Sequence, residues 1–90
     1  MARKDMNQIA ITVLPEALMI PAEASAEAYY ELGLMHSCGR NAPMDLVLAH
    51  KWFNVAMARG FKPAAERRAE LAGEMSRDEI ALALREAREF

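Results

Sequence analysis

The sequence predicts an all-α protein, and two observations carry this prediction. No run of six residues between 22 and 90 alternates large apolar and polar side chains, so no half-buried strand is indicated. Four stretches of that region instead repeat their apolar side chains at the spacing of a helix face, and these stretches are residues 22–37, 43–59, 63–74 and 77–90. They predict four amphipathic helices around one small core.

The first predicted helix covers residues 22–37. Pro21 precedes it, and proline suits a helix start because its missing N–H is not needed there. The predicted core face carries Ala28, Tyr29, Leu32, Gly33, Met35 and His36. Gly39, Asn41 and Pro43 follow and predict a turn, since these residue types supply the backbone conformations that turns require.

Pro43 opens the second predicted helix, at residues 43–59. Asp45 falls in its first turn, where a negative charge suits the helix dipole. Gly60 predicts its end, because glycine readily adopts the left-handed conformation found after a helix C-terminus. Trp52 and Phe53 lie on its apolar face and are predicted to fill the core.

Two further helices are predicted after residue 62. Pro63 begins the third, and Ser76 with Glu79 forms the pattern of a capping box at the start of the fourth. Residues 1–21 are predicted as an N-terminal arm, and the conformation of residues 9–20 stays open between strand, helix and loose segment.

Composition limits the classes of partner. A net charge of −2 gives no electrostatic reason to expect nucleic acid or an anionic membrane as partner. The apolar stretch at residues 9–22 is interrupted by prolines and is too short to span a bilayer. Cys38 is the single cysteine, so no intrachain disulfide can form, and a cytoplasmic location is expected.

The region from Ala28 to Ala64 resembles the Sel-one-like repeat, a relative of the tetratricopeptide repeat. The register is kept without a gap, and the positions that carry the resemblance are Ala28, Leu32, Gly33, His36, Gly39, Asp45, Ala49, Trp52, Phe53, Ala56, Gly60 and Ala64. Leu71 and Ala72 repeat the Leu32-Gly33 pair but no complete second repeat follows.

The resemblance implies an α-α superhelix type of fold. It assigns residues 22–62 to one repeat hairpin and residues 63–90 to a degenerate second repeat that acts as a C-terminal capping helix pair. Members of the family scaffold protein complexes and have no catalytic residues of their own. We therefore expect a protein-interaction module or adaptor, neither an enzyme nor a cofactor-binding protein, whose partner the sequence does not name.

Two departures from the family pattern predict self-association. Leu48 and Val55 stand where the family has lysines, and they share one stripe of the second helix away from its core face. Repeat arrays generally need about three units for stability, and this chain has fewer. We therefore expect a homodimer that covers Leu48 and Val55.

A candidate partner-binding surface lies on the first helix. Tyr30 and Leu34 are one turn apart and are predicted to point away from its packing face. Glu27 and Glu31 form part of an acidic stripe beside them, which by itself is typical of a solvated face. The inner helix of such repeat hairpins usually lines the binding surface, so these four residues are the predicted partner contacts.

The alternative function is a regulatory protein that binds a metal ion or a small molecule through His36, Cys38 and His50. These three are the chain's only His and Cys side chains, but their spacing matches no common zinc pattern. A packed core or hairpin role for His36 is therefore favoured. No pattern of a phosphate-binding loop or a catalytic triad is visible, which again argues against an enzyme.

Overall fold

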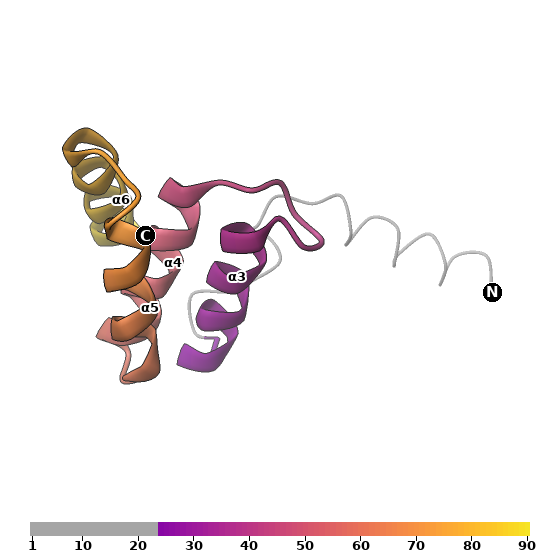
Figure 1. The fold of residues 1–90 in the computed structure, drawn as a ribbon. Coiled ribbons are helices and arrows are strands. Elements are labelled where there is room, and N and C mark those ends of the chain that lie inside the picture. The colour runs from indigo at the N-terminus through magenta and orange to yellow at the C-terminus, as the bar shows by residue number, and fades with distance from the viewer. Residues whose placement is uncertain (1–23) are drawn as a thin grey trace.

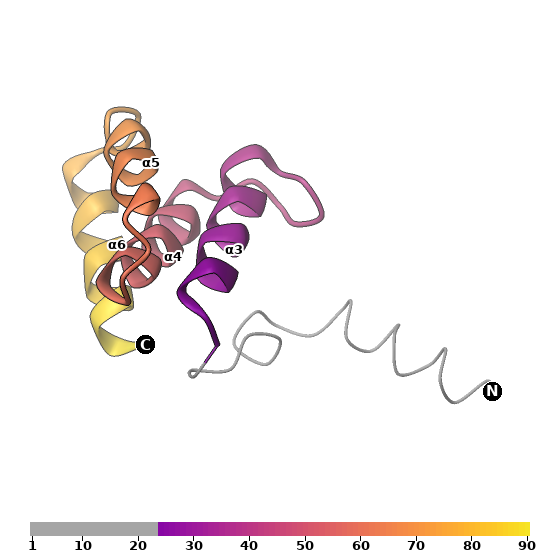
Figure 2. The same ribbon diagram turned by 90° about the horizontal axis from the view of Figure 1, so that it is seen from below.

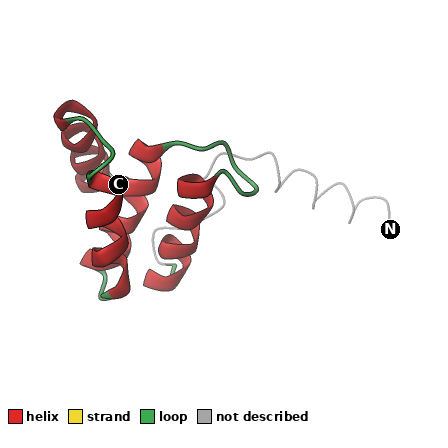
Figure 3. Cartoon of the chain, viewed as in Figure 1, coloured by secondary structure: helices red, strands yellow, loops and turns green. Residues whose placement is uncertain are grey.

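The structure, a computed structural model, describes residues 24–90. That part of the chain contains four α-helices and no strand (Figure 3): α3 (Ala26–Cys38), α4 (Leu46–Ala58), α5 (Pro63–Ala72) and α6 (Arg77–Glu89). The predicted all-α class is confirmed. The predicted arm at residues 1–21, with the open question about residues 9–20, lies outside the described residues.

Helix α4 is the centre of the fold. The three other described helices all pack against it, and they pack on it far more than on one another (Figures 1 and 2). Helices α3 and α5 run in the same direction, opposite to α4 (Figure 1). The described part of the chain is therefore a helical hairpin, α3–α4, extended by two helices that share α4 as their support.

Helix α3 begins later than the sequence predicts. Ser25 is its N-cap: the backbone there is extended, at φ −67° and ψ 154°, and the side-chain hydroxyl accepts from Ala28 N at 3.2 Å. Ala24 and Ser25 are therefore not helical, which corrects the predicted start at residue 22. A serine side chain that satisfies an unpaired backbone N–H of the first turn fixes the helix start here.

Helix α4 also starts later than predicted. Asp45 is its N-cap, and its carboxylate accepts from Leu48 N at 3.1 Å, so Pro43 belongs to the preceding turn. In that turn Gly39 and Asn41 have φ values of 73° and 63°. Asparagine tolerates this left-handed conformation better than most residues, so Asn41 suits its position in the turn.

Helices α5 and α6 follow the prediction closely. Pro63 is the first residue of α5, and the capping box of Ser76 and Glu79 is present at the start of α6. Ser76 Oγ accepts from Glu79 N at 3.1 Å, and the Glu79 carboxylate accepts from Ser76 N at 2.8 Å. Gly60 has φ 105° and lies in the turn between α4 and α5, as predicted.

The core lies on both sides of α4. Its buried members are Tyr29, Leu32, Ala49, Trp52, Phe53, Val55, Ala56, Ala64 and Leu71. Trp52 and Phe53 are each 1 % exposed, which confirms their predicted place. Three of these nine buried residues are alanines, so the bulky side chains of the core come from few positions.

An aromatic cluster fixes the end of α6 to the hairpin. Trp52 stacks on Tyr29 with ring centroids 5.7 Å apart, and Phe90 meets both rings edge-on at 4.8 Å and 5.6 Å. The Arg59 guanidinium lies over the Tyr29 ring at 4.9 Å and donates to the Tyr29 hydroxyl at 3.1 Å. Edge-to-face aromatic pairs and cation–π contacts add to the area that the rings bury. The cluster joins α3, α4 and α6.

Candidate functional site

The structure corrects the predicted orientation of Tyr30 and Leu34. Both side chains are half-buried and pack against the core cluster. The Tyr30 ring lies 5.6 Å from the Phe53 ring and 4.8 Å from the Phe61 ring. Phe61 belongs to the turn between α4 and α5, so Tyr30 faces α5 and that turn.

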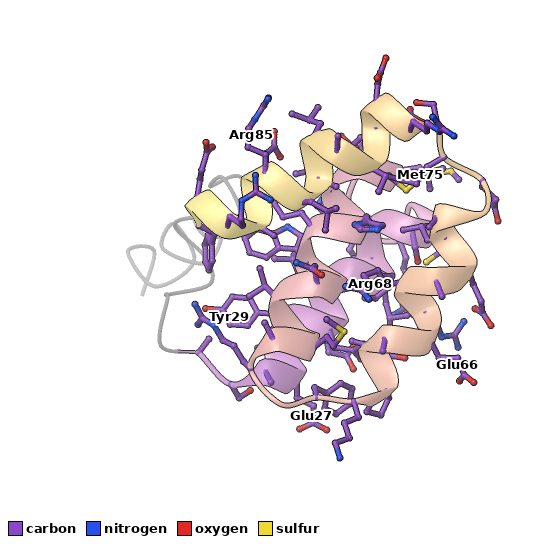
Figure 4. All side chains as sticks on the ribbon, turned by 90° about the vertical axis from the view of Figure 1, so that its left-hand side faces the viewer. Glu27, Tyr29, Glu66, Arg68, Met75 and Arg85 are labelled. Carbon is purple, nitrogen blue, oxygen red and sulfur yellow. The ribbon has the colours of Figure 1, made fainter. Side chains whose placement is uncertain are left out.

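The other two predicted partner contacts, Glu27 and Glu31, are exposed on α3. Figure 4 shows Glu27 directed away from the body of the protein at one end of the helix. Their position fits the solvated acidic face that the sequence indicates. They remain available to a partner, but neither lines the hollow between α3 and α5 or the one between α4 and α6.

A hollow of about 180 Å³ lies between α3 and α5, with α4 beneath it. Its lining residues come from the three helices and from the turn after α5: Ser37, Phe53, Arg67, Glu70, Leu71 and Glu74. Tyr30 lies toward one end of it, because the Tyr30 side chain is the main cause of the raised pKa of Arg67. The hollow therefore combines an aromatic floor with polar and acidic walls.

Gly33 lets the floor of this hollow lie close to α3. A Cβ atom at Gly33 would fall 2.6 Å from Phe53 Cδ1 and Cε1, well inside van der Waals contact. The Phe53 ring therefore occupies space that any other residue at position 33 would fill. Glycine at this position is a requirement of packing and not of backbone conformation.

The α5 side of the hollow was not among the predicted site residues. Arg67 and Glu70 lie one turn apart on α5, and Glu74 follows the end of that helix. Arg67 Nη1 lies 3.8 Å from Glu70 Oε1. The sequence feature that could have pointed to these residues is the recurrence of Leu32-Gly33 as Leu71-Ala72. In repeat proteins the first helices of neighbouring units lie side by side, so this recurrence predicts α5 next to α3. The charged residues of α5 by themselves do not indicate which helix lies next to them.

His36 holds the turn of the α3–α4 hairpin. It is 3 % exposed, and its Nδ1 lies 2.9 Å from the carbonyl oxygen of Pro43. A carbonyl oxygen only accepts, so Nδ1 carries the proton. The His36 carbonyl accepts from Asp45 N at 3.0 Å. The side chain and the backbone carbonyl of His36 therefore both connect α3 to the segment that leads into α4.

The structure does not bring His36, Cys38 and His50 together as ligands. Cys38 is exposed, with its Sγ 3.2 Å from the carbonyl oxygen of Leu34 in the same helix. Within residues 24–90 no group of three His, Cys, Asp or Glu side chains has the arrangement to hold a metal ion.

His50 is a buried polar residue on α4. It is 3 % exposed, and its Nδ1 finds no hydrogen-bond partner among residues 24–90. Burial lowers the pKa of His50, and the nearby positive charge of Arg68 lowers it further. Arg68 itself donates from Nη1 to Asn54 Oδ1, and Figure 4 shows it reaching from α5 toward α4 while Glu66 points outward.

We expect His50 to make the protein less stable in mild acid. Its pKa is lowered in the folded state, so below the usual value of about 6.5 the unfolded chain binds the additional proton. Stability is therefore lost as the pH falls from about 6.5 toward the folded-state pKa, and is unaffected by this group above that range. Urea denaturation should show a smaller loss between about pH 7.5 and pH 5.5 for His50→Leu than for the wild type. Equal losses would contradict this assignment.

Val55 is not the open apolar residue that the sequence predicts. It is 5 % exposed, belongs to the core cluster, and lines a hollow together with Ala87 of α6. Leu48, its predicted companion, is half-buried. The described chain therefore covers Val55 by itself, because α6 packs along the side of α4 on which Val55 lies.

Comparison with protein-family models, with curated proteins and with solved structures found no match for this chain. In residues 24–90 no helix has the length and apolar character needed to cross a membrane.

Proposed function

We propose that this protein is a small protein-interaction module of the helical-hairpin type, and that a protein partner binds over the hollow between α3 and α5. The observation that supports the proposal is this hollow itself. It has an aromatic floor at Phe53, carboxylates at Glu70 and Glu74, and an open side toward solvent. The resemblance of residues 28–64 to the Sel-one-like repeat supports the same role.

The hollow suits a partner for physical reasons. The Phe53 ring packs closely against Gly33 of α3 and against the Tyr30 ring, so the floor is already ordered before binding. A preformed surface loses less conformational entropy on association than a mobile one. Glu70 and Glu74 line one wall, so polar contacts can fix the orientation of the partner.

A site-specific cross-link tests this proposal. A photo-reactive benzoylphenylalanine replaces Glu74, which lines the hollow, and in a matched control it replaces Ala81, which is exposed on α6. In the cells that make the protein naturally, illumination should give a discrete protein adduct from position 74 and none from position 81. Adducts of the same protein in equal yield from both positions, or from position 81 alone, would contradict the proposal.

We further propose that the protein self-associates, although Val55 no longer takes part. Leu48 is half-buried, and Met44, four residues before it, is 64 % exposed. These apolar side chains support a weak dimer contact near the start of α4. The mass from light scattering should rise with concentration for the wild type and stay at that of one chain for Met44→Glu. A single-chain mass throughout for the wild type would exclude the dimer.

The proposed location stays the cytoplasm, supported by the single cysteine Cys38.

A further inference from the structure

A second hollow, of about 230 Å³, lies between the C-terminal halves of α4 and α6. Its lining residues are Asn54, Val55, Ala58, Arg59, Ala87 and Arg88. The floor is apolar, formed by the side chains of Val55, Ala58 and Ala87. Because alanines from both helices face each other here, the helices pack without filling the space between them.

The polar groups of this hollow are hydrogen-bond donors. Arg59 and Arg88 have donors only, since a guanidinium group carries no acceptor. Asn54 Oδ1 accepts one hydrogen bond from Arg68 Nη1. The Asn54 NH₂ group adds two donors that can serve a ligand.

The charge of the hollow is positive. None of its lining residues, all within residues 24–90, is Asp or Glu, and Arg59 and Arg88 each carry one positive charge. Arg59 is held at the edge by its hydrogen bond to the Tyr29 hydroxyl and by its position over the Tyr29 ring. Lys51 adds a positive charge near Arg59, because Lys51 Nζ lies 5.6 Å and the Arg59 guanidinium 5.7 Å from the same Phe90 ring. The lining is therefore positive although the chain as a whole has a net charge of −2.

We propose that this hollow binds a carboxylate-bearing segment of a protein partner, in which an Asp or Glu side chain stands beside an aliphatic one. The carboxylate accepts from Arg88 and from the Asn54 NH₂ group, and the aliphatic side chain covers Val55 and Ala87. Arginine binds carboxylates through charge-assisted hydrogen bonds, which are stronger than neutral ones. This surface is separate from the hollow between α3 and α5, and the proposal stands whether or not that hollow binds a partner.

An NMR titration with two matched peptides tests the proposal. The full chain is labelled with ¹⁵N and titrated with acetyl-Gly-Leu-Glu-Leu-Gly-amide or with the same peptide carrying Gln in place of Glu. We expect the Glu peptide to shift the amide signals of Val55, Ala58, Ala87 and Arg88. The Gln peptide should bind roughly tenfold more weakly, because it cannot form charge-assisted hydrogen bonds. Equal binding of the two peptides, or shifts confined to other residues, would overturn the proposal.

Two arginine variants on α6 provide the matched control. Arg88→Gln removes an exposed side chain that lines the hollow, and Arg85→Gln removes an exposed one that does not, which Figure 4 shows directed outward. Binding of the Glu peptide should weaken by roughly fivefold or more in Arg88→Gln and by less than about twofold in Arg85→Gln. Equal effects of the two changes would mean that only the overall charge matters, which overturns the proposal.

Two further outcomes would assign the hollow to another occupant. If sodium acetate alone produces the same shifts as the Glu peptide at equal concentration, the hollow binds any small anion and not a protein segment. If the shifts appear without peptide as the protein concentration rises, the occupant is a second copy of this chain. Either result would overturn the proposal as stated.

Discussion

Trp52→Ala should remove most of the stability of the folded protein. Trp52 is 1 % exposed, and its ring contacts Tyr29 from α3 and Phe90 beyond α6. Truncating a buried tryptophan to alanine costs about 3–5 kcal/mol, from lost burial and from the cavity left behind. Small domains have total stabilities near the lower end of about 5–15 kcal/mol, so this loss approaches the whole.

Urea denaturation followed by far-UV circular dichroism measures this effect. Because Trp52→Ala could abolish the folded baseline, Trp52→Phe serves as a second variant that retains an aromatic ring and should still unfold cooperatively at a lower urea midpoint. Arg85→Ala is the control, since Arg85 is exposed on α6 and its loss should change the stability by less than about 0.5 kcal/mol. A Trp52→Ala protein as stable as Arg85→Ala would show that the aromatic cluster does not hold the helices together.

Gly33→Ala should destabilise the protein, although alanine is the better helix former. Alanine in place of a helical glycine is worth about 1 kcal/mol in favour of the helix. Here the new methyl group would lie 2.6 Å from two ring atoms of Phe53. Phe53 is 1 % exposed and its ring also packs against Tyr30, so a shift of the ring disturbs other core contacts. Overpacking of this kind costs about 1–3 kcal/mol, and we expect a net loss of about 1 kcal/mol or more.

Gly73→Ala is the matched control for that change. Gly73 follows α5 with φ −64°, and its nearest contact for an added Cβ is Glu70 O at 3.4 Å. Alanine fits there and should be neutral or stabilise by up to about 1 kcal/mol. The double variant Gly33→Ala/Phe53→Leu should lose less than the sum of its single changes, because the smaller side chain frees the space. Additive losses, or a stabilised Gly33→Ala, would contradict the packing argument.

The elements of the fold were predictable where local chemistry decides them. The capping box of Ser76 and Glu79 and the proline at the start of α5 involve only neighbours in the chain, and both are found. The starts of α3 and α4 were misplaced because prolines were favoured over the capping side chains of Ser25 and Asp45. A capping serine or aspartate just before an apolar run is the more direct signal of a helix start.

The candidate site was less predictable, because it depends on which helices lie side by side. A helical wheel shows that Leu48 and Val55 share a stripe, but it does not show that α6 covers Val55. Within α4 only His50, Lys51 and Asn54 are polar, and a helix that is apolar nearly all round is buried by several neighbours. This composition was the available signal that α4 is central.

The central position of α4 also sets the order in which the described helices can open. Opening α3, α5 or α6 separates mainly one interface, the one with α4, whereas opening α4 separates all three. Local fluctuations therefore reach the outer helices one at a time, and the backbone amides of α4 become exposed to exchange with solvent only when the whole domain unfolds. Phe53 belongs to one hollow and Val55 to the other, so both proposed binding surfaces rest on the part of the molecule that opens last.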